Sequence, residues 1–553
     1  MLDAEVPTNT DQDSRPTEDT KRGIVTRSTV IGVWSLAAVL ALLLAGLTWL
    51  RTDPRFSPAA GLTAAARLVF ERSVAAADPD KVFEAAARGM MSALDPYSMY
   101  LSPREFELFQ SESEGEYVGI GAEVQIVNGF VTIFDVYPQS PAADALLRPG
   151  DRIMSIDGTS TEDLDLGDVL ELMHGEIGTT VQLEIETSGL TVRELTLTRR
   201  PIIIEPFPIV GETRSGIGYV RWAQFSIGAA DRLAAIVEEF NIEEPIGLIL
   251  DLRGNPGGVL SEAVAAAGLF LPSHSDVCTL VDSRGSESFT FETSAIPSVY
   301  HGPLVIVQDD MTASSAEVLA AALQDAGRAV IVGQRSFGKG WVQSIFPLDD
   351  GGAIRLSTAR YTTPSGTQLG DPAHARALYD SVIAGRPWTG IGLVPDIEVP
   401  ETPADAWVES LLHSGLLLEF VAKYVDDWPA TGAYDSELLI GELHKWLKRR
   451  PHAFTTSAAD SLLASLQSNP DRWQSARLHA SCIKKLKAAI KKEILLLRKR
   501  EHPQLLRYLW EQRLLGLGQV DPGELEALLD ADPDLATARD LLEQPERYNS
   551  VIE

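Results

Sequence analysis

Cysteine is almost absent from this chain. Its 553 residues include only Cys278 and Cys482, which lie too far apart to match a metal site or a disulfide framework. No HExxH zinc motif occurs, and the isolated histidines His174, His274 and His301 are not spaced as metal ligands. The sequence therefore predicts no metal and no cofactor.

Positive charge is also scarce. The 47 Lys and Arg residues are outnumbered by 78 Asp and Glu residues, which gives a formal net charge of −31 at pH 7. Proteins that bind nucleic acid present a basic surface to the phosphates, so nucleic acid is excluded as an expected partner. The composition, with 45% hydrophobic and 23% charged residues, is that of a folded protein. The length predicts several domains.

One long run of the chain carries no charge at all. Residues 29–50 read TVIGVWSLAAVLALLLAGLTWL, and a helix of this length can cross a hydrocarbon core about 30 Å thick. Lys21, Arg22 and Arg27 precede the run, so the positive-inside rule predicts a cytoplasmic tail and an extracytoplasmic (periplasmic) remainder. We expect a single-pass anchor in the inner membrane. A cleaved signal peptide, whose apolar region would be shorter, is the alternative.

The pattern of apolar residues changes several times along the chain and predicts a multidomain α+β protein. After the cytoplasmic tail (1–28) and the anchor (29–50), helical spacing dominates residues 51–112. Residues 113–200 hold short β-type runs between turn residues and predict a compact β domain. In residues 201–401, β runs alternate with helical runs, as in a sheet covered by crossover helices. Residues 402–553 predict a helical C-terminal region.

A pair of serines opens a predicted helix in the third of these regions. The β run PLVIV (303–307) leads through QDDMTA to Ser314 and Ser315. Ser314 and Glu317 have the spacing of a capping box, which is a common way to start a helix. A serine at this position also lies beside free backbone N–H groups, which can hold a developing oxyanion. No GxSxG elbow suggests a Ser-His-Asp arrangement, so a nucleophilic serine needs another base.

Lys339, in the segment RSFGKG after the next β run, is a candidate for that base. A lysine can accept a proton when burial lowers its pKa enough to leave the amine neutral. Gln343, four residues further on, can orient the amine. The alternatives are a solvated loop lysine and His301 as a rival base.

A glycine-rich segment follows the apolar run GLIL. It reads DLRGNPGG over residues 251–258, and its last two residues are Gly257 and Gly258. Glycines allow the backbone to approach a ligand closely, although the segment alone is also compatible with a simple turn.

Read together and in order, these segments resemble the C-terminal processing peptidases, which are tail-specific serine proteases with a Ser/Lys dyad. The resemblance implies a crotonase-like α/β protease core with Ser314 as nucleophile, Lys339 as general base and Gln343 as its orienting partner. It also implies an oxyanion hole formed by the N–H of Ser315 and of one of the two glycines. The segments that carry the resemblance are LDPYSMYL (94–101), GEYVGIGAEV (115–124), GYVRWAQFS (218–226), ILDLRGNPGG (249–258), SFGKGWVQ (336–343), RYTTPSGTQ (360–368) and GIGLVPDIEV (390–399).

The chain departs from the pattern of this family in two places. Relatives usually read Asn-x-x-Ser-Ala-Ser-Ala-Ser-Glu where this chain has QDDMTASSAE (308–317). Alignment on Glu317 and the distance to Lys339 both make Ser314, rather than Ser315, the nucleophile. The second departure is an insertion over residues 370–387, which interrupts a usually short connection.

The β domain of residues 113–200 resembles a PDZ domain, with Gly119, Ile120, Gly121 and Ala122 as its carboxylate loop. Successive N–H groups of such a loop bind a C-terminal carboxylate, and the peptide adds a strand to the sheet. We therefore expect a membrane-anchored serine endopeptidase that cleaves proteins near their free C-termini. The alternatives are a catalytically silent, membrane-tethered PDZ scaffold and a helical assembly factor acting through residues 402–553. Whether the chain forms a homo-oligomer or uses an adaptor protein stays open.

Overall fold

The computed structural model divides the chain into two compact units, residues 1–87 and 88–553, which are described separately. The described residues are 57–370, 391–400, 436–448, 503–515 and 520–552, with isolated positions between 408 and 421 and residue 484, apart from short gaps at 75–76, 114, 128–129, 138, 149, 163, 165, 188–190, 204, 242–245, 283–284 and 286–287. The predicted anchor at 29–50 lies outside them. None of the helices in the described ranges is long and apolar enough to cross a membrane.

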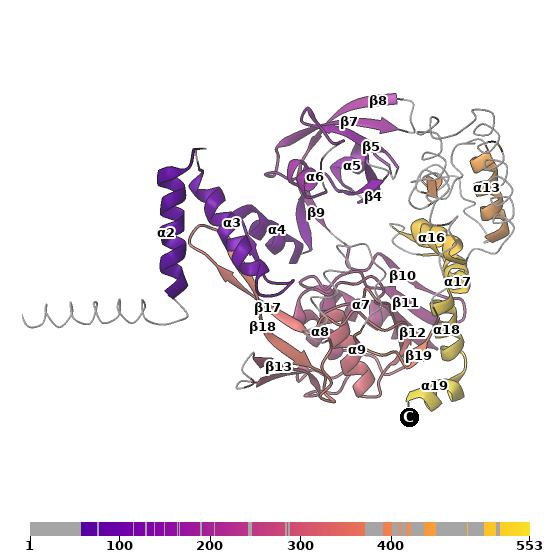
Figure 1. Ribbon diagram of the computed structural model, residues 1–553. Coiled ribbons are helices and arrows are strands. Elements are labelled where there is room, and N and C mark those ends of the chain that lie inside the picture. The colour runs from indigo at the N-terminus through magenta and orange to yellow at the C-terminus, as the bar shows by residue number, and fades with distance from the viewer. Residues whose placement is uncertain are drawn as a thin grey trace, which may run out of the picture. The chain divides into compact units, whose positions relative to one another are not determined.

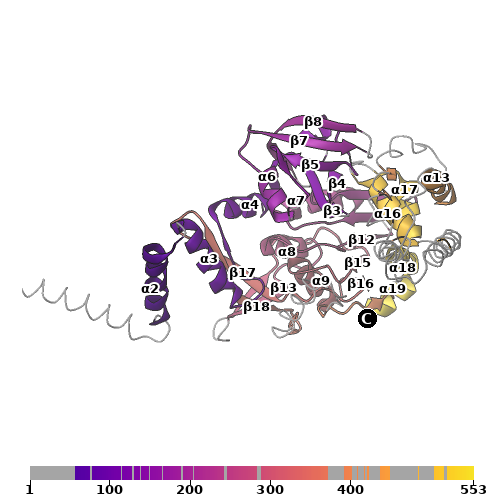
Figure 2. The same cartoon turned by 45° about the horizontal axis from the view of Figure 1, so that its top comes forward.

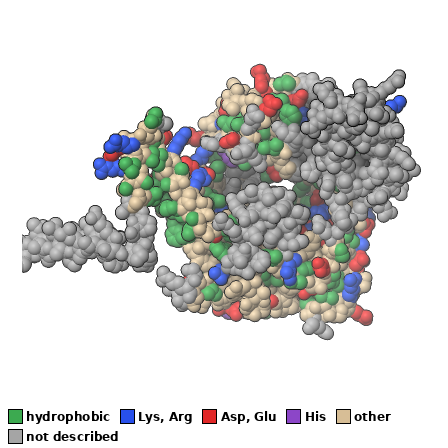
Figure 3. Space-filling view, viewed as in Figure 1, with side chains coloured by type: hydrophobic (Ala, Val, Ile, Leu, Met, Phe, Trp, Pro, Cys, Tyr) green, Lys and Arg blue, Asp and Glu red, His purple; other side chains and the backbone are tan. Residues whose placement is uncertain are grey.

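In the first unit, the described residues form α2 (Ser57–Arg72) and most of α3 (Pro79–Ser92). The side chain of Asp78 accepts a hydrogen bond from Asp80 N at 3.1 Å, and Pro79 occupies the first helical position, where its missing N–H costs nothing. Figure 3 shows hydrophobic side chains on the visible surface of this unit.

The second unit is built around a six-stranded sheet in the order β10-β11-β12-β15-β16-β19. All neighbours in it are parallel except β10 and β11. Every residue of β12 and β15 is buried, as expected for parallel strands covered on both faces. The strands are β10 (Ile209–Glu212), β11 (Ile217–Arg221), β12 (Gly247–Asp251), β15 (Leu304–Gln308), β16 (Val330–Gly333) and β19 (Ile397–Glu398).

Two sets of helices cover the two faces of this sheet (Figures 1 and 2). Alternate residues of β12 point to opposite faces, so Leu248 and Leu250 pack with one set and Ile249 with the other. The first set is α7 (Ala229–Asn241), α8 (Leu260–Ala267) and α9 (Ser315–Asp325). The second set, the C-terminal helices, is α16 (Pro503–Leu514), α17 (Pro522–Ala531), α18 (Pro533–Leu542) and α19 (Pro545–Ile552). The same apolar cluster includes residues of α13 (Ser436–Lys448).

A second, antiparallel sheet carries the segment that contains Lys339. Its strand β18 pairs with β1, β13 and β17, and β14 pairs with β13. Lys339 lies just before β17, and Cys278 is buried on β13. The strands are β1 (Met99–Leu101), β13 (Asp276–Asp282), β14 (Ser288–Glu292), β17 (Trp341–Pro347) and β18 (Ala353–Thr362), and α4 (Pro103–Ser113) follows β1.

The β domain forms its own sheet in the order β3-β4-β5-β7-β8, with β6 paired to β5, around a separate apolar core. Strand β3 lies at one edge of this sheet, and β2 pairs with β9 at the base of the domain. Its elements are β2 (Glu116–Gly119), β3 (Ala122–Val127), β4 (Phe130–Val136), α5 (Pro141–Asp144), β5 (Arg152–Ile156), β6 (Thr159–Ser160), α6 (Leu166–Met173), β7 (Thr180–Thr187), β8 (Thr191–Thr198) and β9 (Arg200–Ile203).

Candidate active site

Ser314 immediately precedes α9 in an unusual backbone conformation. Its φ of 58° and ψ of −121° lie outside the extended region that residues before a helix normally adopt. A sparsely populated conformation of this kind costs about 1–3 kcal/mol and persists only where the surroundings impose it. The side chain of Ser314 is partly exposed, whereas the neighbouring residues of α9 are buried.

The surroundings include the buried carboxyl group of Glu317, which accepts four hydrogen bonds. Ser336 Oγ and Gly338 N donate to Oε1, at 2.5 and 2.7 Å. The N–H groups of Lys339 and Ser314 donate to Oε2, at 2.8 and 2.9 Å. Burial raises the pKa of Glu317, and these four hydrogen bonds oppose the rise. One carboxyl group thus joins the start of α9 to the loop that carries Lys339.

The amine of Lys339 lies in an environment that favours its neutral form. Burial lowers the pKa of Lys339, nearby Arg355 lowers it further, and Glu317 opposes both. Lys339 Nζ lies 5.4 Å from the centroid of the Tyr97 ring. Within the part of the chain that the structure describes, no hydrogen bond joins this amine to the Ser314 hydroxyl.

Tyr361 on β18 forms a second link between the two loops. Its hydroxyl lies 3.2 Å from the Ser314 carbonyl oxygen and also contacts the carbonyl of Lys339. Gln343, by contrast, donates its side-chain N–H to the Trp341 carbonyl at 3.0 Å. The segments carrying Ser314 and Lys339 are therefore brought together, while the Gln343 side chain is engaged with its own strand.

The glycine-rich loop lies directly against Ser314. A Cβ placed on Gly257 would come within 2.8 Å of Ser314 Cβ and 2.9 Å of Ser315 N. The φ angles of Gly257 and Gly258, 95° and 144°, are accessible mainly to glycine. This agrees with the close backbone approach that the sequence predicts there.

Hydrogen bonding distinguishes the two glycines. The N–H of Gly257 donates to Asn255 Oδ1 at 2.8 Å. The N–H of Gly258 has no acceptor among the described residues, and that of Ser315, at the first helical position, has none within its helix. Gly258 and Ser315 are thus the residues with available N–H groups beside Ser314.

The side chains of the two rival candidates, Ser315 and His301, make other contacts. Ser315 is buried, and its hydroxyl donates to the Gly258 carbonyl at 2.8 Å. His301 is exposed, with Nδ1 3.5 Å from Ser298 Oγ. Of the two serines, Ser314 is therefore the partly exposed one and Ser315 the buried one.

The predicted carboxylate loop, residues 119–122, connects β2 to β3. The carbonyl of Ile120 accepts from Ala142 N at 2.8 Å, and that of Gly121 accepts from Ser140 Oγ at 3.2 Å. The N–H groups of Ile120 and Gly121 have no protein acceptor among the described residues. The loop thus has two free donors next to the edge strand β3.

Comparison with known proteins accounts for this arrangement. Residues 216–372 match Peptidase family S41, and residues 132–187 match the PDZ domain. The chain is 32% identical over 341 residues to the carboxy-terminal-processing protease of Bartonella bacilliformis, covering 60% of this chain and 74% of that protein. The chain belongs to the carboxy-terminal processing proteases. Family membership makes it a serine peptidase with a PDZ domain.

Other members of the family match over a similar region. Identity is 38% over 286 residues to the carboxyl-terminal-processing protease of Synechocystis sp., covering 50% of this chain and 66% of that protein. It is 31% over 325 residues to the carboxy-terminal processing protease CtpB of Bacillus subtilis, covering 58% and 66%. The chain thus spans just under two thirds of the length of these two relatives.

Sequence reasoning missed several residues of this site. The sequence indicates Glu317 only as part of a capping box with Ser314, and this capping box is formed, with Ser314 N donating to Glu317 at 2.9 Å. The contacts of Glu317 with residues 336–339 had no local signal. Tyr97 and Tyr361 lie in LDPYSMYL and RYTTPSGTQ, two segments that carried the family resemblance, so this resemblance was the signal that could have identified them.

Proposed function

We propose that the chain is a membrane-anchored endopeptidase that cleaves proteins near their free C-termini through an acyl-enzyme on Ser314. The observation that carries the proposal is the shared Glu317 carboxyl group, which receives the N–H of both Ser314 and Lys339 through one oxygen. This contact holds the two loops together beside the free N–H of Gly258.

In the proposed mechanism, neutral Lys339 accepts the proton of the Ser314 hydroxyl as its oxygen attacks the scissile carbonyl carbon. The N–H groups of Gly258 and Ser315 hold the oxyanion. Lys339 then returns the proton to the leaving amine, which departs as the tetrahedral intermediate collapses to the acyl-enzyme. Water, deprotonated by the same amine, attacks the ester, and the proton passes to Ser314 as the acid product leaves. The lowered pKa of Lys339 supports its role as the base.

Active-site substitutions test the dyad. Ser314→Ala and Lys339→Ala should each abolish cleavage, and the double variant should be hardly worse, because nucleophile and base act as one unit. Lys339→Arg should also fail, since guanidinium does not deprotonate in proteins. Ser315→Ala is the matched control and should stay active.

Covalent labelling gives an independent result. A serine-reactive acylating probe should modify Ser314, as located by peptide mapping. A folded protein that is never acylated and cleaves no peptide would instead fit a silent PDZ scaffold.

For substrate selection, we propose that residues 119–122 bind the C-terminal carboxylate while the peptide pairs with β3. Support comes from the free N–H groups of Ile120 and Gly121 and from the edge position of β3. Amidating the substrate's C-terminus removes the charge. Binding should then weaken by about 1.5–3 kcal/mol, or roughly 10- to 150-fold. Equal cleavage of acid and amide peptides would contradict this mode of recognition.

The membrane anchor is proposed from residues 29–50 of the sequence alone. The full chain should fractionate with inner membranes, with its catalytic part in the periplasm, while a chain starting at Asp53 should be soluble. Recovery of a native N-terminus beyond residue 50 would show that the segment is cleaved instead.

A further inference from the structure

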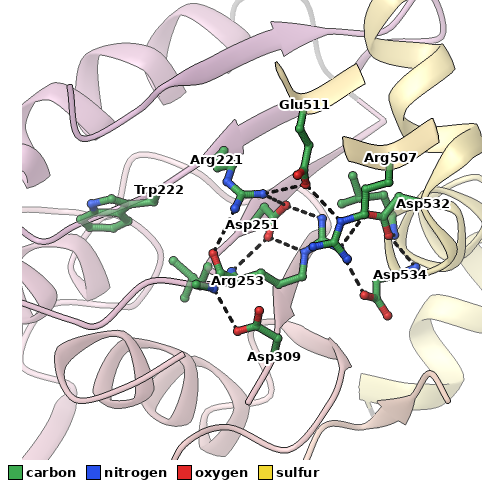
Figure 4. Close-up of polar contacts among 12 residues, drawn as sticks. Arg221, Trp222, Asp251, Arg253, Asp309, Arg507, Glu511, Asp532 and Asp534 are labelled. Atoms are coloured by element: carbon green, nitrogen blue, oxygen red, sulfur yellow. Dashed lines mark hydrogen bonds and ion pairs between the residues drawn. The ribbon is translucent and has the colours of Figure 1, made fainter. Parts of the chain in front are cut away.

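The loop that presents Gly258 is attached to the C-terminal helices through Arg253. Arg253 Nε and Nη2 donate to the two oxygens of Asp251, at 2.9 and 2.7 Å. Its Nη1 donates to Asp532 at 2.7 Å and to Asp534 at 3.2 Å, at the start of α18 (Figure 4). The Arg253 side chain is 1% exposed. One buried guanidinium therefore joins the end of β12 to α18.

Arg221, at the end of β11, makes a second connection. Its Nη1 lies 3.2 Å from Glu511 on α16, and its Nη2 donates to the Arg253 carbonyl at 3.4 Å. Arg507 of α16 lies 3.2 Å from Glu511 and 3.4 Å from Asp532. α18 thus contacts Arg253 directly, and α16 is connected to it through Arg221 and Asp532. We call this set the C-terminal ion cluster: Arg221, Asp251, Arg253, Arg507, Glu511, Asp532 and Asp534.

The need to attach the C-terminal helices to the sheet does not by itself account for the C-terminal ion cluster. A buried ion pair offsets its desolvation only in good geometry, and apolar residues in its place are often as stable or more so. The C-terminal helices already pack on the sheet through apolar side chains, including Leu509, Leu528 and Leu535. A planar guanidinium that is bound by carboxylates at both of its edges fixes the orientation of the groups it joins as well as the distance between them. The cluster therefore supplies defined geometry at the point where the loop leaves β12.

The path from Arg253 to the site is short and held at each step. Gly254 N donates to Asp309 at 2.9 Å, and the Asn255 amide donates to the Trp222 carbonyl at 2.8 Å. Asn255 Oδ1 then accepts the N–H of Gly257, and the next N–H along the chain is the free one of Gly258. A shift at Arg253 would therefore be passed to the donor beside Ser314.

We propose that the C-terminal helices belong to the catalytic apparatus, because they hold Arg253 and thereby position the oxyanion loop, residues 253–258. Arg253 and Asp532 are positioning residues. The proposal rests on the proposed function, in which the Gly258 N–H stabilises the oxyanion. It assigns to α16 and α18, which lie outside the matched peptidase segment, an effect on the rate of the chemical step that acts through the oxyanion loop.

Asp532→Asn, compared with Glu526→Gln, tests the proposal. Glu526 of α17 pairs with Arg214 at 2.7 Å and so also joins a C-terminal helix to the core, but it contacts no residue of the oxyanion loop. Asp532→Asn should lower kcat by ~10- to 100-fold, somewhat less than outright loss of an oxyanion donor. KM should stay within about twofold, because donors aimed at the transition state act on kcat. Glu526→Gln should change neither constant.

Hydrogen exchange of the peptide spanning the oxyanion loop provides a readout that does not depend on activity. Exchange should speed up in Asp532→Asn and stay unchanged in Glu526→Gln. Rates are normalised to folded protein by near-UV circular dichroism. If Asp532→Asn does not fold, Glu511→Gln, at the partly exposed rim of the cluster, should show a smaller change of both readouts in the same direction.

The outcomes separate this proposal from the proposed function. Equal kcat and equal loop exchange in the cluster variant and its control would overturn the positioning role, even if Ser314→Ala is inactive. A fully active Ser314→Ala enzyme would overturn the proposed mechanism instead, and the exchange comparison would still decide whether the helices hold the loop.

Discussion

Glu317→Gln is the most direct perturbation of the contact between the loops that carry Ser314 and Lys339. The substitution keeps the shape of the side chain but turns one acceptor oxygen into an NH₂ donor. Each oxygen of Glu317 receives two hydrogen bonds, so the new nitrogen must face either Gly338 N and Ser336 Oγ or the N–H groups of Ser314 and Lys339. The Ser336 hydroxyl can rotate, but a backbone N–H cannot. At least one buried N–H is therefore left without its acceptor.

The size of the effect follows from this count. A buried donor without an acceptor costs about 1–3 kcal/mol. The cheaper orientation of the glutamine strands only Gly338 N, so the free energy of unfolding should fall by about 1–3 kcal/mol. The lost negative charge also acts on Lys339, since Glu317 raises the pKa of that amine. Without it the pKa falls further, and the limb on which kcat/KM rises with pH should move to lower pH.

Urea unfolding and the pH dependence of kcat/KM on a quenched peptide measure both effects. Asp396→Asn is a suitable control, because this exposed carboxylate also accepts a backbone N–H, from Ile331 at 2.7 Å, with Gln324 as its other partner. The control should leave the pH profile in place. If Glu317→Gln leaves both the free energy of unfolding and the rising limb unchanged, the carboxyl group does not hold the two loops together.

Three further substitutions have defined outcomes. Asn255→Ala removes the acceptor of the Gly257 N–H and a buried hydrogen bond to the backbone, so kcat should fall more than KM changes in steady-state kinetics. Ser315→Ala loses one hydrogen bond to Gly258, worth about 0.5–1.5 kcal/mol of stability, and should keep its acylation at Ser314 by peptide mapping. Burial raises the pKa of Asp534 to about 6, so this carboxyl binds its proton more tightly when folded and stability should fall as pH rises from about 4 to 6. Asp534→Asn should remove that pH dependence. At alkaline pH its free energy of unfolding should exceed that of the unsubstituted protein by up to about 3 kcal/mol, as thermal unfolding at two pH values would show.

The sequence predicted the broad fold because its signals are local. The uniformly buried strands β12 and β15 appear in the sequence as continuous apolar runs, and the segments between them have helical spacing. The prediction of a multidomain α+β chain with a PDZ domain and a serine-protease core is confirmed. That the C-terminal helices cover a face of the protease sheet could not be predicted, because no periodicity specifies which apolar surface a helix will meet.

For the candidate site, the sequence likewise predicted the features that have a local signal and not the contacts between distant segments. Ser314 and Lys339 could be predicted to lie close together because each follows a parallel strand, β15 or β16, and such strands place their following loops at one edge of the sheet. The pairing of Arg253 with Asp532 could not be predicted, because the two residues are 279 positions apart in the sequence and no local pattern connects them. The choice of Gly258 over Gly257 depended on where the Asn255 side chain points, which only the fold determines.

The placement of α16–α19 on the protease sheet also affects the order in which the enzyme can assemble. Strands that start at Ile209 have one face covered by helices that are synthesised some 300 residues later, as shown by the separation of 279 residues between Arg253 and Asp532. Until those helices have been synthesised, Ile249 and Val305 lack the apolar side chains that the helices pack against them. A chain that has not yet reached α16 thus already contains Ser314 and Lys339 but lacks part of the apolar core of the six-stranded sheet. The C-terminal helices therefore tie completion of the core to the last part of the polypeptide, and we expect the proposed activity to begin only when that part has folded.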